Sequence, residues 1–346
     1  YFGALSLQKI GGGSEIQVNL IALALHNLCK RFISPPFIFM QPVLNFAALT
    51  ASLKAQGRRW RVAVVCGTDR ATLEALMRGT AEGFIEPWLF IPENFNLKNL
   101  PGEVTANPFF HIIPADSDEA AARAAVAMAR RGEADLLMKG LIHTDTLLRA
   151  VLNKEHGLLC KGAVMTHVAL ARMPSYHKML FFTDSAVIPY PNREQRVEQV
   201  RTIVRICRQT GISRPKVALV HCTEKVNGKT FPLTEDYVEV IRMAKEGAFG
   251  DCVVDGPMDV KSACSADAMR IKNIKSPING DADALVMPDI EAGNCFYKTI
   301  TLFSQADTAG VLAGTKVPVV LPSRGDDAMS KFFSLALAAW CCYGEE

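Results

Sequence analysis

Short apolar runs alternate with longer amphipathic runs along most of this sequence, and this alternation limits the folds that the chain can adopt. Segments 61–66, 134–138 and 317–321 have the length of strands and are largely apolar. Segments 193–209 and 233–246 instead repeat apolar residues at helical spacing. Apolar strands that alternate with such helices are typical of a largely parallel sheet covered on both faces. We therefore predict an α/β fold, with further strands at 88–91, 163–171, 179–183, 216–222, 252–254 and 284–287, and further helices at 70–82 and 326–340.

Length and charge narrow the functional classes. The chain has 346 residues, enough for about two domains of roughly 150 residues each. Its 38 Lys and Arg residues and 35 Asp and Glu residues leave a net charge of only +3. A nucleic-acid-binding surface needs clustered Lys and Arg, and this sequence contains no such run. We therefore expect no nucleic-acid partner.

Cysteine is plentiful, with 10 residues, but its spacing suits neither a metal site nor a disulfide framework. No C-x-x-C occurs, and the closest pair is the adjacent Cys341 and Cys342. Cys66, Cys222 and Cys252 fall in apolar runs that resemble strands, where a free thiol behaves as a small apolar side chain. We predict a reducing, cytoplasmic location and no bound metal.

Residues 1–42 do not share the pattern of the rest. Their most apolar stretch, 16–29, has fourteen residues and includes two asparagines and a histidine, so it is too short and too polar to span a bilayer. It also lacks the basic segment and the cleavage site of a signal peptide. We predict an N-terminal extension of unassigned role, either an accessory amphipathic helix or residues added to the natural chain, and no membrane partner.

Polar side chains directly follow most of the predicted strands. In open parallel α/β sheets, ligands bind outside the carboxyl ends of the strands, and helix starts at these ends attract phosphate. Charged or hydroxyl groups beside small residues therefore predict a site for an anionic ligand. The residues are Lys139, His143 and Thr144 after 134–138, Asp184 after 179–183, Thr223 after 216–222, Asp289, Glu291 and Asn294 after 284–287, and Ser323 and Arg324 after 317–321.

Each of these residues also has a structural explanation. Asp184 or Thr223 could cap the following helix, and His143 could be a hydrogen-bonded structural histidine. Lys139 is harder to explain in this way, because a lysine that ends an apolar strand just before a glycine is poorly placed to reach solvent. The convergence of such residues at several strand ends favours a site over separate structural roles.

Motifs of several other enzyme classes are missing from the sequence. No G-x-G-x-x-G follows a strand and no G-x-x-x-x-G-K-[ST] occurs, which disfavours the nucleotide-binding folds that carry them. No H-E-x-x-H or G-x-S-x-G occurs either. A cysteine nucleophile beside histidine, as in His221 and Cys222, is disfavoured because adjacent strand residues point to opposite faces. Cys160 after His156 is a second candidate pair that we disfavour.

Five segments carry a family resemblance: ADLLMKGLIHTDTLLRAVLNKEHGL (134–158), FFTDSAVIPYP (181–191), DGPMDV (255–260), SPINGDADALVMPDIEAGNCFYK (276–298) and VPVVLPSRGD (317–326). In order and spacing they resemble the phosphate acetyl/butyryltransferase family, and most closely its phosphate butyryltransferases. The resemblance runs from about residue 42 to the C-terminus and leaves out the first forty residues.

The resemblance implies a two-domain α/β architecture, with largely parallel sheets and flanking helices, similar to isocitrate and isopropylmalate dehydrogenases. Domain 1 would comprise 43–153 plus 305–346, domain 2 would comprise 154–304, and the protein would be a homodimer. The implied reaction is reversible: acyl-CoA and inorganic phosphate give acyl phosphate and CoA, with a short, butyryl-type acyl group. Coenzyme A and phosphate are substrates in this family, and no tightly bound metal or redox cofactor is implied.

The resemblance also implies roles for individual residues. Ser323 and Arg324 resemble the family's phosphate-binding Ser-Arg, and a guanidinium can bind phosphate through two parallel hydrogen bonds. Arg149 falls where related acetyltransferases carry a second functional arginine, although it could instead be a solvated residue of an amphipathic helix. Lys139, His143 and Thr144 could line the same pocket and donate to the thioester oxygen as it gains charge. The expected substrate-binding residues are His143, Thr144, Thr223, Asp289, Glu291 and Asn294.

The base that takes the proton of the CoA thiol is a separate question. Acetyl-type relatives place an acid at the position of Ser330, which cannot serve. Butyryl-type relatives carry an aspartate directly after Ser-Arg-small, which is Asp326 here. We assign the base to Asp326 and keep Asp184 as the second choice, with a helix cap as the alternative role of Asp326.

The sequence shows no credible nucleophile dyad, so we predict direct transfer within a ternary complex and no acyl-enzyme. Three alternatives remain open. A metal- and NAD-dependent decarboxylating dehydrogenase of the same architecture should carry an Arg-rich substrate motif and clustered aspartates. A non-catalytic CoA-binding protein is disfavoured by the intact Ser323-Arg324 and Lys139-Gly140. A phosphate acyltransferase that acts on acyl carrier protein would usually bring a basic docking patch.

Overall fold

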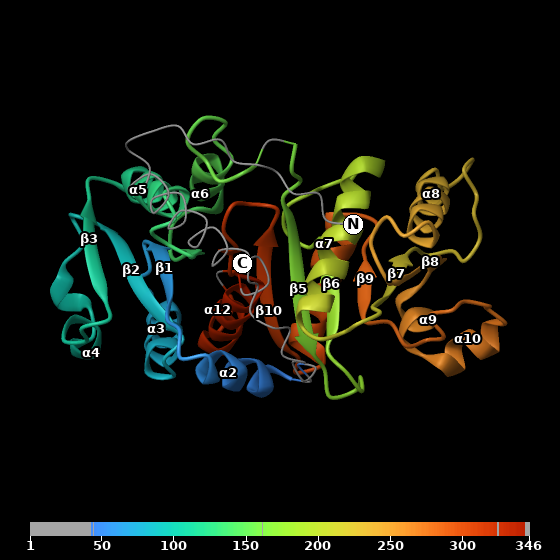
Figure 1. The fold of residues 1–346 in the computed structure, drawn as a ribbon, viewed down its shortest axis with the longest axis horizontal. Coiled ribbons are helices and arrows are strands. Elements are labelled where there is room, and N and C mark those ends of the chain that lie inside the picture. The colour runs from blue at the N-terminus through green and yellow to red at the C-terminus, as the bar shows by residue number, and fades with distance from the viewer. Residues whose placement is uncertain (1–42, 44, 161, 324, 343–346) are drawn as a thin grey trace, which may run out of the picture. The chain divides into compact units, whose positions relative to one another are not determined.

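The computed structural model describes residues 43, 45–160, 162–323 and 325–342, all of which belong to one compact unit, Pro42–Glu345. The predicted extension 1–42 and Arg324 lie outside the described residues. Figure 1 shows strands side by side in a sheet, with helices packed against it. The strands are β1 Trp60–Val65, β2 Ile85–Pro92, β3 His111–Ala115, β4 Leu136–Lys139, β5 Thr166–Arg172, β6 Leu180–Thr183, β7 Lys216–Val220, β8 Val253–Met258, β9 Ala284–Val286, β10 Asp307–Ala313 and β11 Val319–Val320.

The helices have their starts fixed by side-chain caps in most cases. Asn192 and Gln195 form a capping box at the start of the longest one. The helices are α2 Phe46–Ala55, α3 Arg70–Ala81, α4 Gly102–Thr105, α5 Asp118–Arg130, α6 Thr144–Val151, α7 Arg193–Gln209, α8 Leu233–Lys245, α9 Val260–Cys264, α10 Ala266–Lys272, α11 Ile290–Phe303 and α12 Ala328–Cys342, with a 3₁₀ turn at Leu97–Asn99.

The sheet has 11 strands in the order β3-β2-β1-β4-β11-β10-β5-β6-β9-β7-β8. Most neighbouring strands are parallel, but β10 pairs antiparallel with both β11 and β5, and β5 pairs antiparallel with β6. The predicted α/β fold with a largely parallel sheet is confirmed.

The antiparallel pairs change the expected arrangement of the strand ends. They divide the parallel strands into two blocks that run in opposite directions, β1 to β4 with β11 in one, and β6 to β9 in the other. The strands of one block therefore end on the side of the sheet where the strands of the other block begin. For this reason, the position of the predicted site residues at strand ends does not by itself bring all of them together.

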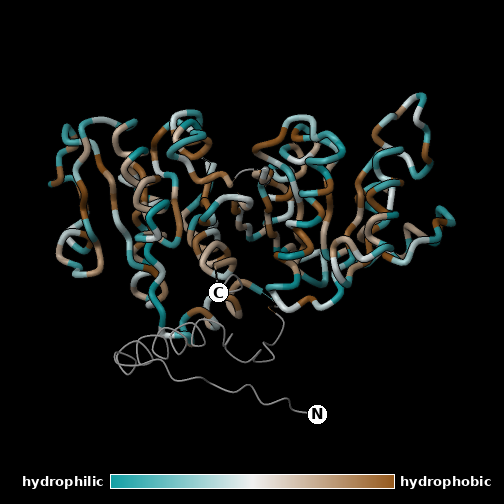
Figure 2. The backbone as a smooth tube through the Cα atoms, turned by 45° about the horizontal axis from the view of Figure 1, so that its top comes forward, coloured by the Kyte–Doolittle hydropathy of each residue, from teal (hydrophilic) through white to brown (hydrophobic). Residues whose placement is uncertain are grey.

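Two buried apolar clusters flank these antiparallel strands. One includes Leu137, Leu147 and Val319, and the other includes Phe182, Leu285 and Ile300. Figure 2 shows hydrophobic residues concentrated along the strands and on parts of the helices. We propose that these clusters are the cores of the two predicted domains, 43–153 plus 305–346 and 154–304.

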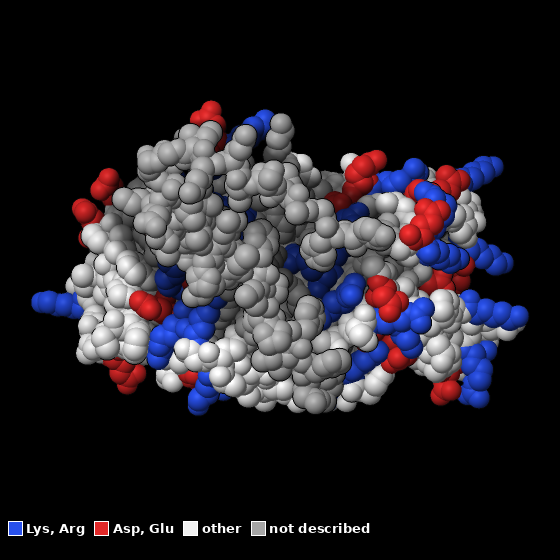
Figure 3. All heavy atoms as spheres, viewed as in Figure 1, with Lys and Arg blue, Asp and Glu red and all other residues white. Residues whose placement is uncertain are grey.

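Charged side chains of both signs are mixed on the visible surface of the part that carries α8 and α10, as Figure 3 shows. Within the described residues, no helix has both the length and the apolar character that crossing a membrane requires.

Candidate active site

The carboxylate of Asp184 is the most heavily hydrogen-bonded group at a predicted site position. It follows β6 and is only 2% exposed. Its Oδ2 accepts from Thr166 Oγ1 and from the backbone N–H of His167, both at 3.0 Å. Its Oδ1 accepts from the N–H groups of Ala186 and Val187, both at 2.8 Å. These donors match the roughly four acceptor positions of a carboxylate, so the side chain fixes the turn rather than capping a helix.

A serine–histidine pair lies beside this turn and was not found from the sequence. Ser185 Oγ is 2.9 Å from Nδ1 of His167, and both side chains are buried. Burial lowers the pKa of His167, against the opposing charges of Asp184 and Asp326, so the ring is held neutral. A Cβ at Gly310 would come within 2.6 Å of its Nε2, so only glycine leaves room for the ring there.

Helix α11 passes directly over the Asp184 turn. Asp289 caps its start, accepting from Ala292 N–H at 2.8 Å. A Cβ at Gly293 would lie 2.0 Å from the Asp184 carbonyl oxygen, so glycine permits this close approach. The amide of Asn294 donates to the carbonyl oxygen of Ser185 at 3.2 Å.

The middle of α11 contacts the loop that follows β11. Tyr297 donates to Asp326 Oδ1 at 3.2 Å, and Lys298 donates to Ser323 Oγ at 3.2 Å. Within the loop, the N–H of Ser323 donates to Asp326 Oδ2 at 2.8 Å. Helix α11 thus connects the Asp184 turn to the Ser323–Asp326 loop, which joins predicted site residues from both blocks of strands.

Asp326 is not the cap of α12. Its neighbour Asp327 accepts from the N–H of Ser330 at 2.7 Å and takes that position instead. The helix consequently begins at Ala328 rather than at the predicted residue 326. Within the described residues, two of the roughly four acceptor positions of Asp326 are occupied, by Tyr297 and by Ser323 N–H.

Lys139 ends β4 and is 2% exposed, which agrees with the expectation that it cannot reach solvent easily. Its Nζ donates to the carbonyl oxygen of Gly140 at 3.1 Å. In the sheet Met138 pairs with Val320, so Lys139 lies on the strand next to the segment that leads into Ser323. Its position therefore suits a cation at the edge of the same loop.

The remaining predicted residues are more exposed. His143 is the N-cap residue of α6 but makes no side-chain cap, and Thr144 begins that helix. Arg149 lies on the exposed part of α6. Thr223 accepts from the N–H of Lys225 at 3.2 Å in the loop after β7 rather than at a helix start. Glu291, exposed at the start of α11, accepts from the hydroxyl of Tyr190 at 2.5 Å.

Comparisons with known proteins agree with this fold. The family model described as phosphate acetyl/butaryl transferase matches residues 116–339. A phosphate acetyltransferase of Thermotoga maritima is 36% identical over 82% of this chain and 96% of its own length. A phosphate butyryltransferase of Clostridium acetobutylicum is also 36% identical, over 86% of this chain and 98% of its own length. The crystal structure of a branched-chain phosphotransacylase from Enterococcus faecalis superposes with a TM-score of 0.71 at 33% identity, covering 82% of this chain and 99% of that one.

The fold and these matches define a phosphate acyltransferase, an enzyme that moves an acyl group between CoA and phosphate. The chain belongs to the phosphate acetyl/butaryl transferase family, as the family model and the relatives at 36% identity show. This assignment separates it from the dehydrogenase and the non-catalytic alternatives. The matched region contains the residues from Lys139 to Asp326.

Proposed function

We propose that this enzyme transfers a short, butyryl-type acyl group directly between CoA and phosphate, in a ternary complex at the Ser323–Asp326 loop. One observation carries the proposal: a hydroxyl, an ammonium group and a carboxylate meet in this loop, through the contacts of Lys298 with Ser323 and of Ser323 with Asp326. Overall identity does not distinguish the two types, because the acetyl and butyryl relatives are equally similar in sequence. The butyryl type is instead supported by the aspartate directly after Ser-Arg-Gly, which resembles the butyryl-type relatives.

Phosphate binding needs cations and hydrogen-bond donors close together. Ser323 and Arg324 are the proposed ligands, and Lys298 adds an ammonium group beside the serine hydroxyl. A phosphate oxygen then attacks the thioester carbonyl carbon, the C–S bond breaks, and CoA leaves as the thiolate. We assign Lys139 to the carbonyl oxygen as it becomes an oxyanion, because a buried ammonium is a strong donor to developing charge.

The reverse reaction begins with removal of the thiol proton of CoA. The thiolate attacks the carbonyl carbon of the acyl phosphate, the C–O bond to phosphate breaks, and phosphate leaves. Asp326 suits the role of base better than Asp184, because among the described residues only Tyr297 and the N–H of Ser323 hydrogen-bond its carboxylate. The hydrogen bonds of Asp184 occupy all of its positions.

The buried pair of Ser185 and His167 is the one serine–histidine contact that could suggest an acyl-enzyme among the residues that the structure describes. Its geometry argues for a structural role. No acidic side chain of the described residues hydrogen-bonds the His167 ring, since Asp184 accepts from the backbone N–H of His167 instead. Direct transfer without a covalent intermediate therefore remains our proposal.

The acyl chain length and the need for phosphate can be tested together. Purified protein is given acetyl-, propionyl-, butyryl- and hexanoyl-CoA, and thiol release is followed with and without phosphate. We expect butyryl-CoA to have the highest kcat/KM and thiol release to require phosphate. Release without phosphate would overturn direct transfer, and faster turnover of acetyl-CoA would overturn the butyryl assignment. Arg324→Ala should remove activity even at saturating phosphate.

The remaining expectations carry over from the resemblance. We propose a homodimer that works in the cytoplasm without a tightly bound cofactor, and that uses His143, Thr144, Arg149, Thr223, Asp289, Glu291 and Asn294 to contact the substrates. Light scattering on the purified protein tests the dimer, which should have twice the 37.8 kDa of one chain. Thiol release in the presence of a chelator tests the independence from metal.

A further inference from the structure

Tyr297 packs its ring against the apolar cluster that contains Phe182 and directs its hydroxyl to the carboxylate of Asp326. The Tyr297 ring packs against the cluster that contains Phe182, whose ring centroid is 6.3 Å away. Its hydroxyl lies 3.2 Å from Asp326 Oδ1 and 3.4 Å from Thr308 Oγ1. The ring therefore fixes where the hydroxyl sits, and the hydroxyl contacts the group that we assign as base.

The direction of these hydrogen bonds follows from the chemistry of the carboxylate. An ionised carboxylate can only accept, so the Tyr297 proton points toward Asp326. Thr308 is then left to donate to the Tyr297 oxygen, and Ser330 Oγ lies 3.4 Å from Thr308 Oγ1 as the next hydroxyl. A chain of hydroxyl donors aimed at one carboxylate polarises each bond in the same direction.

Tyr297 can hold this role over the working range of pH. Burial raises the pKa of Tyr297 well above its ordinary value, and the neighbouring charge of Asp326 raises it further. The phenol therefore stays protonated. It can therefore donate its hydrogen bond to Asp326 Oδ1 throughout this range, which keeps Oδ1 from rotating away.

We propose that Tyr297 is a positioning residue, which holds the Asp326 carboxylate in the orientation that takes the thiol proton of CoA. The inference rests on the proposed function of Asp326 as the base. The other described groups around Asp326 are the N–H of Ser323 and the acid Asp327 from its own loop and the neutral His167 from β5, while Lys298 from α11 contacts Ser323 in the same loop. Among these, Tyr297 is the side chain with a hydrogen bond to Asp326 in the described residues.

The test is the steady-state kinetics of the reaction of CoA with butyryl phosphate, with kcat and the KM for each substrate measured separately. Tyr297→Phe keeps the ring and removes the hydroxyl. We expect at least a tenfold loss of kcat with little change in either KM, because the carboxylate is no longer held in place while the substrate contacts remain.

Tyr176→Phe is the matched control. Tyr176 belongs to the same apolar cluster and its hydroxyl donates to the carbonyl oxygen of Ala282 at 2.7 Å. This variant should lose thermal stability and keep the wild-type kcat and KM values. A second variant, Thr308→Val, removes the hydroxyl behind Tyr297 and should lower kcat by a smaller amount.

Two outcomes separate the inference from the proposed function. If Asp326→Asn keeps full activity, the assignment of the base is wrong, and the role of Tyr297 is overturned with it. If Asp326→Asn is inactive while Tyr297→Phe and Thr308→Val keep the wild-type kcat, the inference about Tyr297 alone is overturned. A lower kcat in Tyr297→Phe with unchanged KM values, and no further loss on adding that change to Asp326→Asn, supports it.

Discussion

The ammonium nitrogen of Lys298 lies 3.2 Å from the hydroxyl oxygen of Ser323. The two residues come from different parts of the chain, Lys298 from the middle of α11 and Ser323 from the loop after β11. Their contact places a positive charge beside the serine that resembles the family's phosphate ligand. It also shows that α11 contributes to the loop as well as to the Asp184 turn.

Lys298→Met should weaken phosphate binding. The change removes one charge–phosphate contact but keeps the aliphatic part of the side chain, so we expect the KM for phosphate to rise at least tenfold. The KM for acyl-CoA should change much less. Steady-state kinetics with each substrate varied in turn measures both constants. Lys54→Met on α2, also exposed, is the control, and an equal rise of both KM values would contradict a specific role of Lys298 in phosphate binding.

Asp326 and Asp184 should respond differently to the same change. Asp326→Asn should lower kcat by at least a hundredfold with little effect on folding, because the proposed base is lost. Asp184→Asn leaves at least one of the three backbone N–H groups that donate to Asp184 without its acceptor, and an unsatisfied buried group typically costs about 1–3 kcal/mol of folding stability. Thermal unfolding and kcat, measured on both variants, distinguish the two roles. A larger loss of kcat in folded Asp184→Asn than in Asp326→Asn would reverse our assignment.

Ser185→Ala tests the alternative of an acyl-enzyme. If the pair with His167 is structural, the variant should keep kcat within about threefold of wild type after correction for folded protein. The measurement is thiol release from butyryl-CoA, together with the intact mass of protein mixed with butyryl-CoA in the absence of phosphate. A protein heavier by one butyryl group in wild type, and its disappearance in Ser185→Ala, would establish Ser185 as a nucleophile and end the proposal of direct transfer.

Several parts of this structure follow from local sequence signals. The predicted helix 193–209 matches α7, because its capping residues and its apolar period point to the same limits. Lys139 was singled out because it ends an apolar strand, and its burial agrees with that reasoning. Such features depend on residues that are close together in the chain.

The contacts that bring the site residues together depend on pairing between segments that are distant in the sequence. Strand β10 was not predicted, and it turns the sheet antiparallel beside β5. The reversal between β5 and β6 did have a signal, since the link 173–179 is shorter than the dozen or so residues of a parallel crossover. That hairpin brings Ser185 to His167. The contacts of Tyr297 and Lys298 had no comparable local signal, because apolar spacing along α11 does not show which loop its other side meets.

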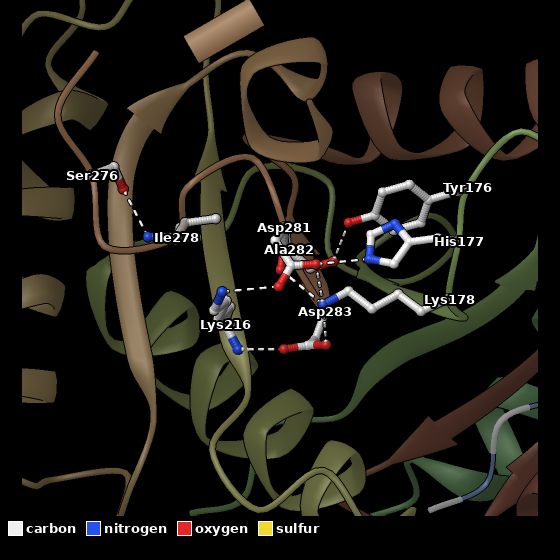
Figure 4. Close-up of polar contacts among 9 residues, drawn as sticks. All are labelled: Tyr176, His177, Lys178, Lys216, Ser276, Ile278, Asp281, Ala282 and Asp283. Atoms are coloured by element: carbon white, nitrogen blue, oxygen red, sulfur yellow. Dashed lines mark hydrogen bonds and ion pairs between the residues drawn. The ribbon is translucent and has the colours of Figure 1, made fainter. Parts of the chain in front are cut away.

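An ion-pair network of Lys178, Lys216, Asp281 and Asp283 should govern the stability of the fold in acid. Asp281 Oδ1 lies 2.9 Å from Lys178 Nζ, and its Oδ2 lies 2.9 Å from Lys216 Nζ. Lys178 also reaches Asp283 Oδ1 at 2.7 Å, as Figure 4 shows. Burial alone would raise the pKa of Asp281, but the hydrogen bonds from Lys216 and Lys178 outweigh it and lower the pKa to about 2.

Because this pKa is lower in the folded chain than the ordinary 3.8, the stability that Asp281 contributes is present above pH 4 and is lost as the pH falls toward 2. Asp281→Asn should therefore lower the urea midpoint at pH 7 and have little effect near pH 2. Urea unfolding across this range measures the difference. Asp267→Asn is the control, because its pair with Arg270 is highly exposed and exposed pairs contribute little. An equal loss at pH 7 and pH 2 for Asp281→Asn would show that packing, rather than the charge of Asp281, stabilises this part of the fold.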